Sequence, residues 1–247
     1  MGMMVFLFQR VRKRRMIYFV SGIDTDAGKT VVTGCLAAGL QQKGIKVITQ
    51  KLVQTGCPDG VSSDVLVHRK LMGGVHFPED DAQMTMPCVM SYPASPHLVA
   101  EKENRTIDLT AIAAATTELD RRYDIVLVEG AGGLMVPLNR ERLTIDYAAE
   151  KGYPLILVTS GKLGSINHTL LSLEAAERRG MKIAAVVYNR YPVIDEIIEA
   201  ETRAYLKTFL ARHYPQTAYG EIPEMKSVAK FEITDFDEVL NSLISGK

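Results

Sequence analysis

The chain has 247 residues, 47% of them hydrophobic, and carries 29 basic and 29 acidic side chains. This length and hydrophobic content suffice for one substantial core, so a single domain is the default expectation. The balanced charge argues against a general nucleic-acid binder, which would carry a basic excess. The three cysteines, Cys35, Cys57 and Cys88, have unrelated spacings. They indicate neither a disulfide framework nor a zinc site, and they favour a reduced, cytoplasmic location.

The first fifteen residues differ from the rest, because an apolar run at 3–8 is followed by a basic run at 10–15. A secretory signal has its charges before its apolar segment, and this apolar run is far too short to span a bilayer. We therefore interpret residues 1–15 as a disordered tail or a mis-assigned start and expect no membrane partner. The folded domain is expected to cover residues 16–247.

Residues 22–30, GIDTDAGKT, connect a short apolar strand predicted at 16–20 to a helix predicted at 30–43. Glycines in such a loop let backbone N–H groups turn toward anionic oxygens, and the helix N-terminus adds partial positive charge. Lys29 would reach the outer phosphates of a nucleoside triphosphate, and the Thr30 hydroxyl would ligate its Mg²⁺. Gly22 and Gly28 lie one residue further apart than in the common phosphate-binding loop. The flanking strand and helix still favour this interpretation over a glycine turn followed by an exposed lysine.

A second strand is predicted at 46–50, directly after the helix that Gly44 terminates. The order strand, helix, strand predicts a right-handed crossover and a parallel pair of strands. The phosphate-binding loop then lies at the carboxyl edge of the sheet, and Lys51 reaches the same edge.

Residues 52–96 show no clear long element, because glycines and prolines interrupt any regular spacing. An irregular stretch of this length inside a compact domain is more often functional than decorative. It contains Ser62-Ser63-Asp64 ahead of an apolar helical stretch, which resembles a helix N-cap. Asp64 is therefore either part of a cap or a carboxylate near the phosphate-binding edge, and the pattern leaves both interpretations open.

A helix predicted at 109–123 leads into the apolar run 125–128, which we interpret as a strand buried on both faces. Glu129 ends that run, and the glycine-rich residues 130–133 follow. An acid at the phosphate-binding edge suits a Mg²⁺ site, since hard cations take oxygen ligands. Simple strand termination would leave the glycines unexplained, whereas their backbone N–H groups could bind a second anion.

The remainder alternates between strands predicted at 155–159, 183–188 and 218–222 and helices predicted at 166–179 and 194–213. This alternation predicts an α/β fold with a doubly wound, mostly parallel sheet, helices on both faces, and an architecture like that of P-loop NTPases. The five histidines show no metal-ligand spacing, and no serine lies in a nucleophile elbow. These observations exclude metal-hydrolase and serine-hydrolase interpretations.

Several short blocks occur in a specific order: residues 22–30, KLVQTG at 51–56, Ser63-Asp64, Ser95-Pro96-His97, EGAGG at 129–133 and KLGSINH at 162–168. Together they resemble the dethiobiotin synthetase family over most of residues 16–223. The resemblance implies an enzyme of biotin biosynthesis that joins 7,8-diaminononanoate, carbon dioxide and ATP into the cyclic urea of dethiobiotin. It also implies a homodimer.

The resemblance assigns roles to particular residues. It implies that Lys29 and Lys51 are catalytic, and that Thr30, Asp64 and Glu129 hold Mg²⁺. The nucleotide would be bound by Asp26, Ala27, Gly28, Lys29, Thr30, Val31, Asn189 and Pro223. The other substrate would be bound by Thr25, Lys51, Thr55, Gly132, Gly133 and Asn167. Asn167 has an alternative interpretation as the cap of the helix that begins near residue 165.

Two positions depart from the family pattern, which has proline in place of Leu52 and an apolar residue in place of Glu224. Two other classes of protein have a similar fold. Regulatory ATPase switches of the partitioning type carry a signature lysine where this chain has Asp24. Amide synthetases related to cobyrinic acid diamide formation need an attached glutaminase domain, for which 247 residues leave no room. Both interpretations are therefore disfavoured.

Overall fold

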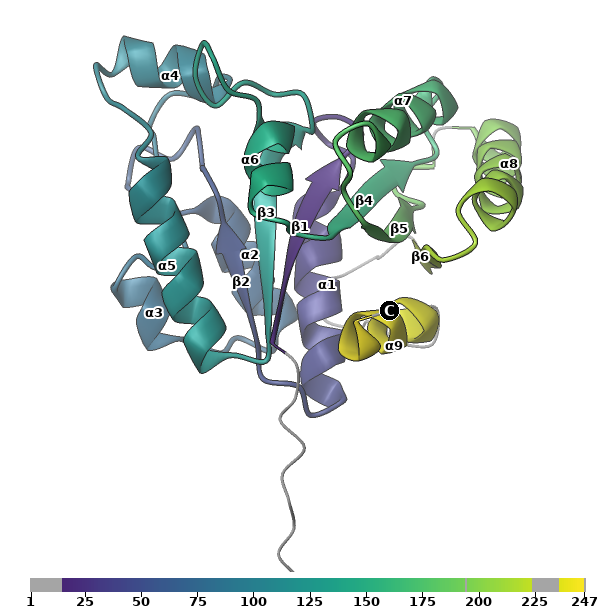
Figure 1. Ribbon diagram of the computed structural model, residues 1–247, viewed down its shortest axis with the longest axis horizontal. Coiled ribbons are helices and arrows are strands. Elements are labelled where there is room, and N and C mark those ends of the chain that lie inside the picture. Colours follow the sequence, from purple (N-terminus) through teal and green to yellow (C-terminus); the bar gives the residue numbers. More distant parts are fainter. Residues whose placement is uncertain (1–14, 194, 224–235, 247) are drawn as a thin grey trace, which may run out of the picture.

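The computed structural model describes residues 15–193, 195–223 and 236–246, so most of the predicted tail, Ile194 and Glu224 lie outside the described residues. Its six strands are β1 (Met16–Gly22), β2 (Val47–Lys51), β3 (Ile125–Gly133), β4 (Leu155–Ser160), β5 (Ile183–Asn189) and β6 (Ala218–Ile222). They form one sheet in the order β2-β3-β1-β4-β5-β6, in which every neighbouring pair is parallel. The prediction of a doubly wound α/β fold is confirmed (Figure 1).

The helices are α1 (Lys29–Gln42), α2 (Ser63–Leu71), α3 (Pro78–Asp81), α4 (Pro96–Lys102), α5 (Leu109–Arg122), α6 (Thr144–Glu150), α7 (Ser165–Glu177), α8 (Glu196–His213) and α9 (Asp237–Ser245). Helices α1, α2 and α9 pack on one face of the sheet, and α5, α6 and α7 pack on the other (Figure 1). No helix among the described residues is long and apolar enough to cross a membrane.

The central strands are apolar without interruption because both of their faces are buried. In β3, Ile125 and Leu127 belong to the core beneath α1 and α9, whereas Val126 and Val128 belong to the core beneath α5 and α6. Side chains along a strand alternate between faces, so one apolar run supplies both cores. Because the strands are parallel, their carboxyl ends all lie at the same edge of the sheet.

The predicted pairing of the first two strands is wrong. They are parallel, but β3 lies between them and pairs with both. A right-handed crossover makes the two strands that it connects parallel. It does not make them neighbours, so a later strand can lie between them. The insertion places Glu129 directly beside Lys51, because these two residues are register partners.

The segment predicted to be irregular at 52–96 contains two short helices, α2 and α3, and ends at the first residue of α4. Helix α2 is the helical stretch expected after Ser62-Ser63-Asp64, whereas α3, α4, α6 and α9 have no counterpart in the prediction. Short helices give too few turns for a periodic apolar pattern to be distinguishable, which explains these differences. The remaining predicted elements are present, with bounds that differ by a few residues.

Helix α9 contributes buried side chains to the core, although the sequence pattern did not predict this helix. Leu240 is fully buried and packs against Gly39 of α1. We expect Leu240→Ala to lower the free energy of unfolding by about 2–5 kcal/mol, measured by chemical denaturation. Ile244 on the same helix is 38% exposed and provides the matched control. Equal losses for Leu240→Ala and Ile244→Ala would contradict this role for α9.

Candidate active site

A cavity of about 290 Å³ lies at the carboxyl ends of β1, β2 and β3. It is lined by residues from the predicted phosphate-binding loop, from the carboxyl ends of β2 and β3 and the residues after β2, and from the start of α2. These residues are Thr25, Asp26, Gly28, Lys29, Thr30, Val31, Lys51, Val53, Gln54, Thr55, Asp64, Glu129, Ala131 and Gly132. Most of the residues singled out in the sequence therefore come together in one place. They do so because parallel strands end at a common edge.

The loop between β1 and α1 has the backbone geometry of an anion-binding turn. Gly28 has a left-handed φ of 94°, and a Cβ there would come within 2.1 Å of the Asn189 side-chain nitrogen. Only glycine fits both conditions. The Asn189 amide donates to the Ala27 carbonyl at 3.2 Å, so the end of β5 supports the loop from behind.

Lys29 lies within this loop with its side chain almost fully buried. Its ammonium donates to the backbone carbonyl of Asp24 at 2.9 Å. Burial lowers the pKa of Lys29, and the nearby Glu129 carboxylate offsets part of that effect. A partly desolvated cation at the N-terminus of α1 is well placed to contact an anion entering the loop.

Lys51 joins the two predicted acids. Its ammonium lies 2.5 Å from Asp64 Oδ2 and 2.8 Å from Glu129 Oε1. The same Glu129 oxygen accepts a hydrogen bond from the Thr30 hydroxyl at 3.0 Å. Lys51 thus connects the predicted metal ligands Asp64 and Glu129, and Thr30 joins them through the shared Glu129 oxygen.

Glu129 and Lys51 are held in their charged forms. Burial by itself raises the pKa of Glu129, but Lys51 and His68 more than offset this effect and the net pKa is lowered. Burial likewise disfavours the charged form of Lys51, yet Glu129 and Asp64 raise its pKa overall. Glu129 and Lys51 therefore form an ionised buried pair.

The structure decides between the two interpretations of Asp64. The N-cap of α2 is Ser62, whose hydroxyl accepts a hydrogen bond from the Val65 N–H at 3.2 Å. Asp64 lies in the first turn of the helix and points to Lys51 instead. Its carboxylate belongs to the cavity, and the interpretation of Asp64 as a cap is wrong.

Five of the predicted site residues lie outside this cavity. Ala27 is buried within the loop, Asn189 lies behind it, and Gly133 lines a neighbouring cavity of about 380 Å³. Asn167 is an exposed residue of α7, whose N-cap position is taken by Gly164 without a side-chain hydrogen bond. The interpretation of Asn167 as a helix cap is therefore wrong.

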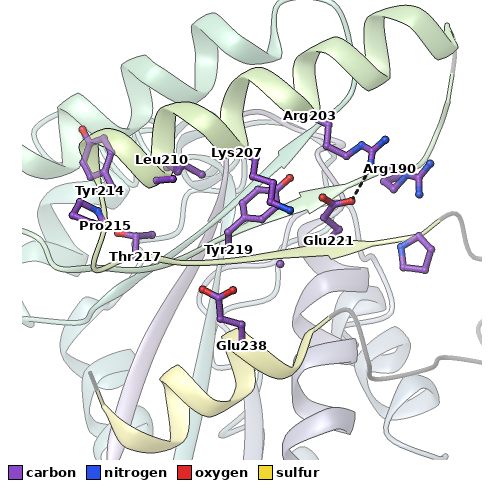
Figure 2. Close-up of a pocket in the computed structure, with 13 residues that line it drawn as sticks. Arg190, Arg203, Lys207, Leu210, Tyr214, Pro215, Thr217, Tyr219, Glu221 and Glu238 are labelled. Atoms are coloured by element: carbon purple, nitrogen blue, oxygen red, sulfur yellow. Dashed lines mark hydrogen bonds and ion pairs between the residues drawn. The ribbon is translucent and has the colours of Figure 1, made fainter.

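Pro223 lines a separate cavity of about 750 Å³ between α8, β6 and α9. Figure 2 shows Arg203 of α8 directed at Glu221 of β6 in this cavity, and their side chains lie 3.4 Å apart. Arg190 is paired similarly with Glu199 at 3.2 Å. Both arginines are therefore already paired with carboxylates, and the greater size of this cavity does not by itself make it the better candidate site.

Two residues that contact the site from outside the cavity lining were not predicted from the sequence. His68 is fully buried, and its Nε2 lies 2.7 Å from Glu129 Oε2. It follows Asp64 by four residues on α2, so the helical spacing alone placed both on one face. Lys162 reaches the loop from the segment before α7 and donates to the Asp26 carbonyl at 3.4 Å.

Comparison with known proteins agrees with this geometry. A family model described as an AAA domain matches residues 17–231. The ATP-dependent dethiobiotin synthetase BioD 2 of Pasteurella multocida is 49% identical over 213 residues, which cover 86% of this chain and 99% of that protein. The ATP-dependent dethiobiotin synthetase BioD of Chlorobaculum tepidum is 47% identical over 242 residues, covering 96% and 98%. This chain belongs to the dethiobiotin synthetase family.

Solved structures show that the fold of this dethiobiotin synthetase family member is shared more widely. A plasmid partition protein from Borrelia burgdorferi superposes with a TM-score of 0.57 at 13% identity, covering 95% of this chain and 100% of that one. Cobyrinic acid a,c-diamide synthase from Mycobacterium smegmatis, with bound ADP and magnesium, gives 0.56 at 18% identity, covering 94% and 97%. At these identities the likeness concerns the fold alone.

Ser62 and Asp64 should have separable roles. Ser62→Ala removes the cap and leaves the Gln54 side-chain oxygen, 2.6 Å away, without its donor. We expect a loss of about 1–3 kcal/mol in the free energy of unfolding, measured by denaturation. Asp64→Ala should cost less stability but raise the Mg²⁺ concentration needed for half activity. A large stability loss for Asp64→Ala with unchanged Mg²⁺ dependence would restore the capping role.

Proposed function

We propose that this protein is an ATP-dependent dethiobiotin synthetase that acts on 7,8-diaminononanoate, carbon dioxide and ATP. The observation that carries the proposal is the convergence of two buried lysines and two carboxylates on one cavity at the phosphate-binding loop. Membership of the dethiobiotin synthetase family supports the same activity.

The chemistry requires that two negatively charged groups meet. A carbamate formed on one amine attacks the γ-phosphorus of ATP, which gives a carbamic-phosphoric anhydride and ADP. The second amine then attacks the carbamoyl carbon, which closes the cyclic urea and releases phosphate. Fixed positive charge around the transferred phosphoryl group lowers the barrier to that first encounter.

Lys29 and Lys51 supply that charge in this proposal. Lys29 extends from the phosphate-binding loop, and Lys51 approaches from the end of the neighbouring β2–β3 pair. Thr25, Thr55 and the backbone N–H groups of Gly132 and Gly133 would hold the carbamate end. Asp26, Ala27, Gly28, Thr30 and Val31 would bind the nucleotide phosphates, with Asn189 and Pro223 on the adenine side.

The donor set fits Mg²⁺. Thr30, Asp64 and Glu129 offer only oxygen atoms, which hard divalent cations prefer. Among the described residues no group of three or more His, Cys, Asp or Glu could hold a metal ion, so the nucleotide phosphates would complete the coordination. When bound, Mg²⁺ neutralises charge on the triphosphate.

The substrate carboxylate and the homodimer belong to the proposal as well. Diaminononanoate carries its carboxylate several methylenes from its amines, so a second recognition site is needed. The N-terminus of α7, with Asn167 in its first turn, offers backbone N–H groups and a favourable dipole. Leu163 and Leu171, 86% and 56% exposed, flank that region and suit a surface covered by a second subunit.

The decisive experiment follows both products of the reaction. Purified protein with diaminononanoate, bicarbonate and MgATP should form dethiobiotin, detected by mass spectrometry, together with an equal amount of ADP. ADP release should require diaminononanoate. Release that instead depends on a protein partner would support a partitioning ATPase, and release that depends on glutamine would support an amide synthetase.

Loss of Lys29 should reduce catalysis strongly. We expect Lys29→Ala to lower kcat/KM by about a hundredfold or more, because a preorganised charged contact to the transferred phosphoryl group is removed. Lys51→Ala should behave similarly. Lys70→Ala, an exposed position on α2, is the control and should retain activity. Near-parental turnover in the Lys29 variant would contradict its catalytic role.

Asn167→Ala should weaken diaminononanoate binding while ATP affinity stays unchanged. The reason is the loss of a donor to the substrate carboxylate, worth about 1.5–3 kcal/mol for a hydrogen bond to a charged group. Isothermal titration of both ligands measures the two affinities. A substrate analogue without the carboxylate should bind parent and variant equally. If the variant still prefers the intact substrate as strongly as the parent does, the carboxylate is bound elsewhere.

A further inference from the structure

His68 has contacts that no role described so far requires. Its imidazole is fully buried on α2 and bridges two groups, with Nε2 2.7 Å from Glu129 Oε2 and Nδ1 3.0 Å from Thr49 Oγ1. Glu129 uses its other oxygen, Oε1, for Thr30 and Lys51. The two carboxylate oxygens therefore face different partners, one toward the cavity and one toward α2.

The hydrogen bonds around Thr49 have a direction. Arg69 Nη1 donates to Thr49 Oγ1 at 2.8 Å, and a guanidinium can only donate. The single hydrogen of the Thr49 hydroxyl is then available for His68 Nδ1. The Glu129 carboxylate can only accept, so His68 Nε2 carries the hydrogen of that contact and donates it.

This series of hydrogen bonds ends at Asp80, in the segment that follows α2. Asp80 accepts two hydrogen bonds from Arg69, at 2.8 and 2.7 Å, and one from the Thr85 hydroxyl at 2.6 Å. The Arg69 guanidinium also lies over the Phe77 ring, 4.6 Å from its centroid. The two hydrogen bonds to Asp80 hold the guanidinium plane of Arg69 in one orientation. The hydrogen bond from Arg69 Nη1 to Thr49 Oγ1 therefore has a fixed direction as well.

We propose that His68 is a positioning residue, which orients the Glu129 carboxylate so that Oε1 faces Thr30 and the divalent-cation site. The relay Asp80, Arg69, Thr49, His68 connects this orientation to the segment between α2 and α4. Partners that hold a ligating carboxylate typically change metal affinity by 10- to 100-fold when they are removed. The inference rests on the proposed function only in taking Glu129 as a metal ligand.

The test compares three substitutions of His68. Gln keeps an N–H donor at the reach of Nε2, Asn places its amide only at the reach of Nδ1, and Leu keeps volume without hydrogen bonds. Leu71→Ala is the matched control, because Leu71 is buried on the same helix but packs against Gly34 of α1. Binding of Mn²⁺ in the presence of ADP, followed by electron paramagnetic resonance, measures metal affinity independently of catalysis.

We expect His68→Leu and His68→Asn to weaken Mn²⁺ binding by about 10- to 100-fold and His68→Gln to stay within about threefold of the parent. Leu71→Ala should lower thermal stability and leave Mn²⁺ affinity unchanged. Thr49→Val, which removes the hydroxyl but keeps the shape, should weaken binding less than His68→Leu does.

Parental Mn²⁺ affinity in His68→Leu would overturn the proposal, as would equal losses in His68→Gln and His68→Leu. A loss in Leu71→Ala matching that in His68→Asn would overturn it too, because general loosening of α2 would then explain both. Unchanged affinity in Thr49→Val would overturn the relay. Dethiobiotin formation by the parent is scored separately, so failure of the proposed activity leaves these metal-binding outcomes readable.

Discussion

The buried Glu129 carboxylate is the constraint on which the rest of the site depends. Its side chain has no exposed surface, and an unpaired charge in that position would cost on the order of several kcal/mol. The structure meets this requirement with Lys51 from β2, Thr30 from α1 and His68 from α2. One anion therefore fixes three separate elements relative to β3.

This constraint also explains why Lys51 lies where it does. The register of β2 and β3 brings it beside Glu129, and the first turn of α2 adds Asp64. The ammonium thus compensates two carboxylates in the ligand-free protein. The same two carboxylates are the proposed ligands of Mg²⁺, so both already lie beside a cation in the ligand-free protein.

The fold alone does not distinguish this protein from its structural neighbours. A plasmid partition protein and a cobyrinic acid a,c-diamide synthase share the architecture at TM-scores of 0.57 and 0.56. The distinction lies in the side chains that each protein carries on the shared loop and strand ends. In the loop of this chain, the Asp24 backbone carbonyl accepts a hydrogen bond from the Lys29 ammonium. Identity of 47–49% over most of the chain supports the same family assignment.

The sequence by itself determined the order of the strands and the longer helices, the phosphate-binding loop and the acid Glu129 at the end of a buried strand. Those features follow from local patterns: apolar runs such as 125–128, the glycines around Lys29, and a charged residue directly after the strands predicted at 46–50 and 125–128. Only the tertiary structure decided which strands are neighbours, that Ser62 and not Asp64 caps α2, and that His68 and Arg69 support Glu129 from behind. Glu129 and His68 are separated by 61 residues in the chain. Contacts over such separations arise when a helix such as α2 packs on a sheet, and no local spacing of residues encodes them.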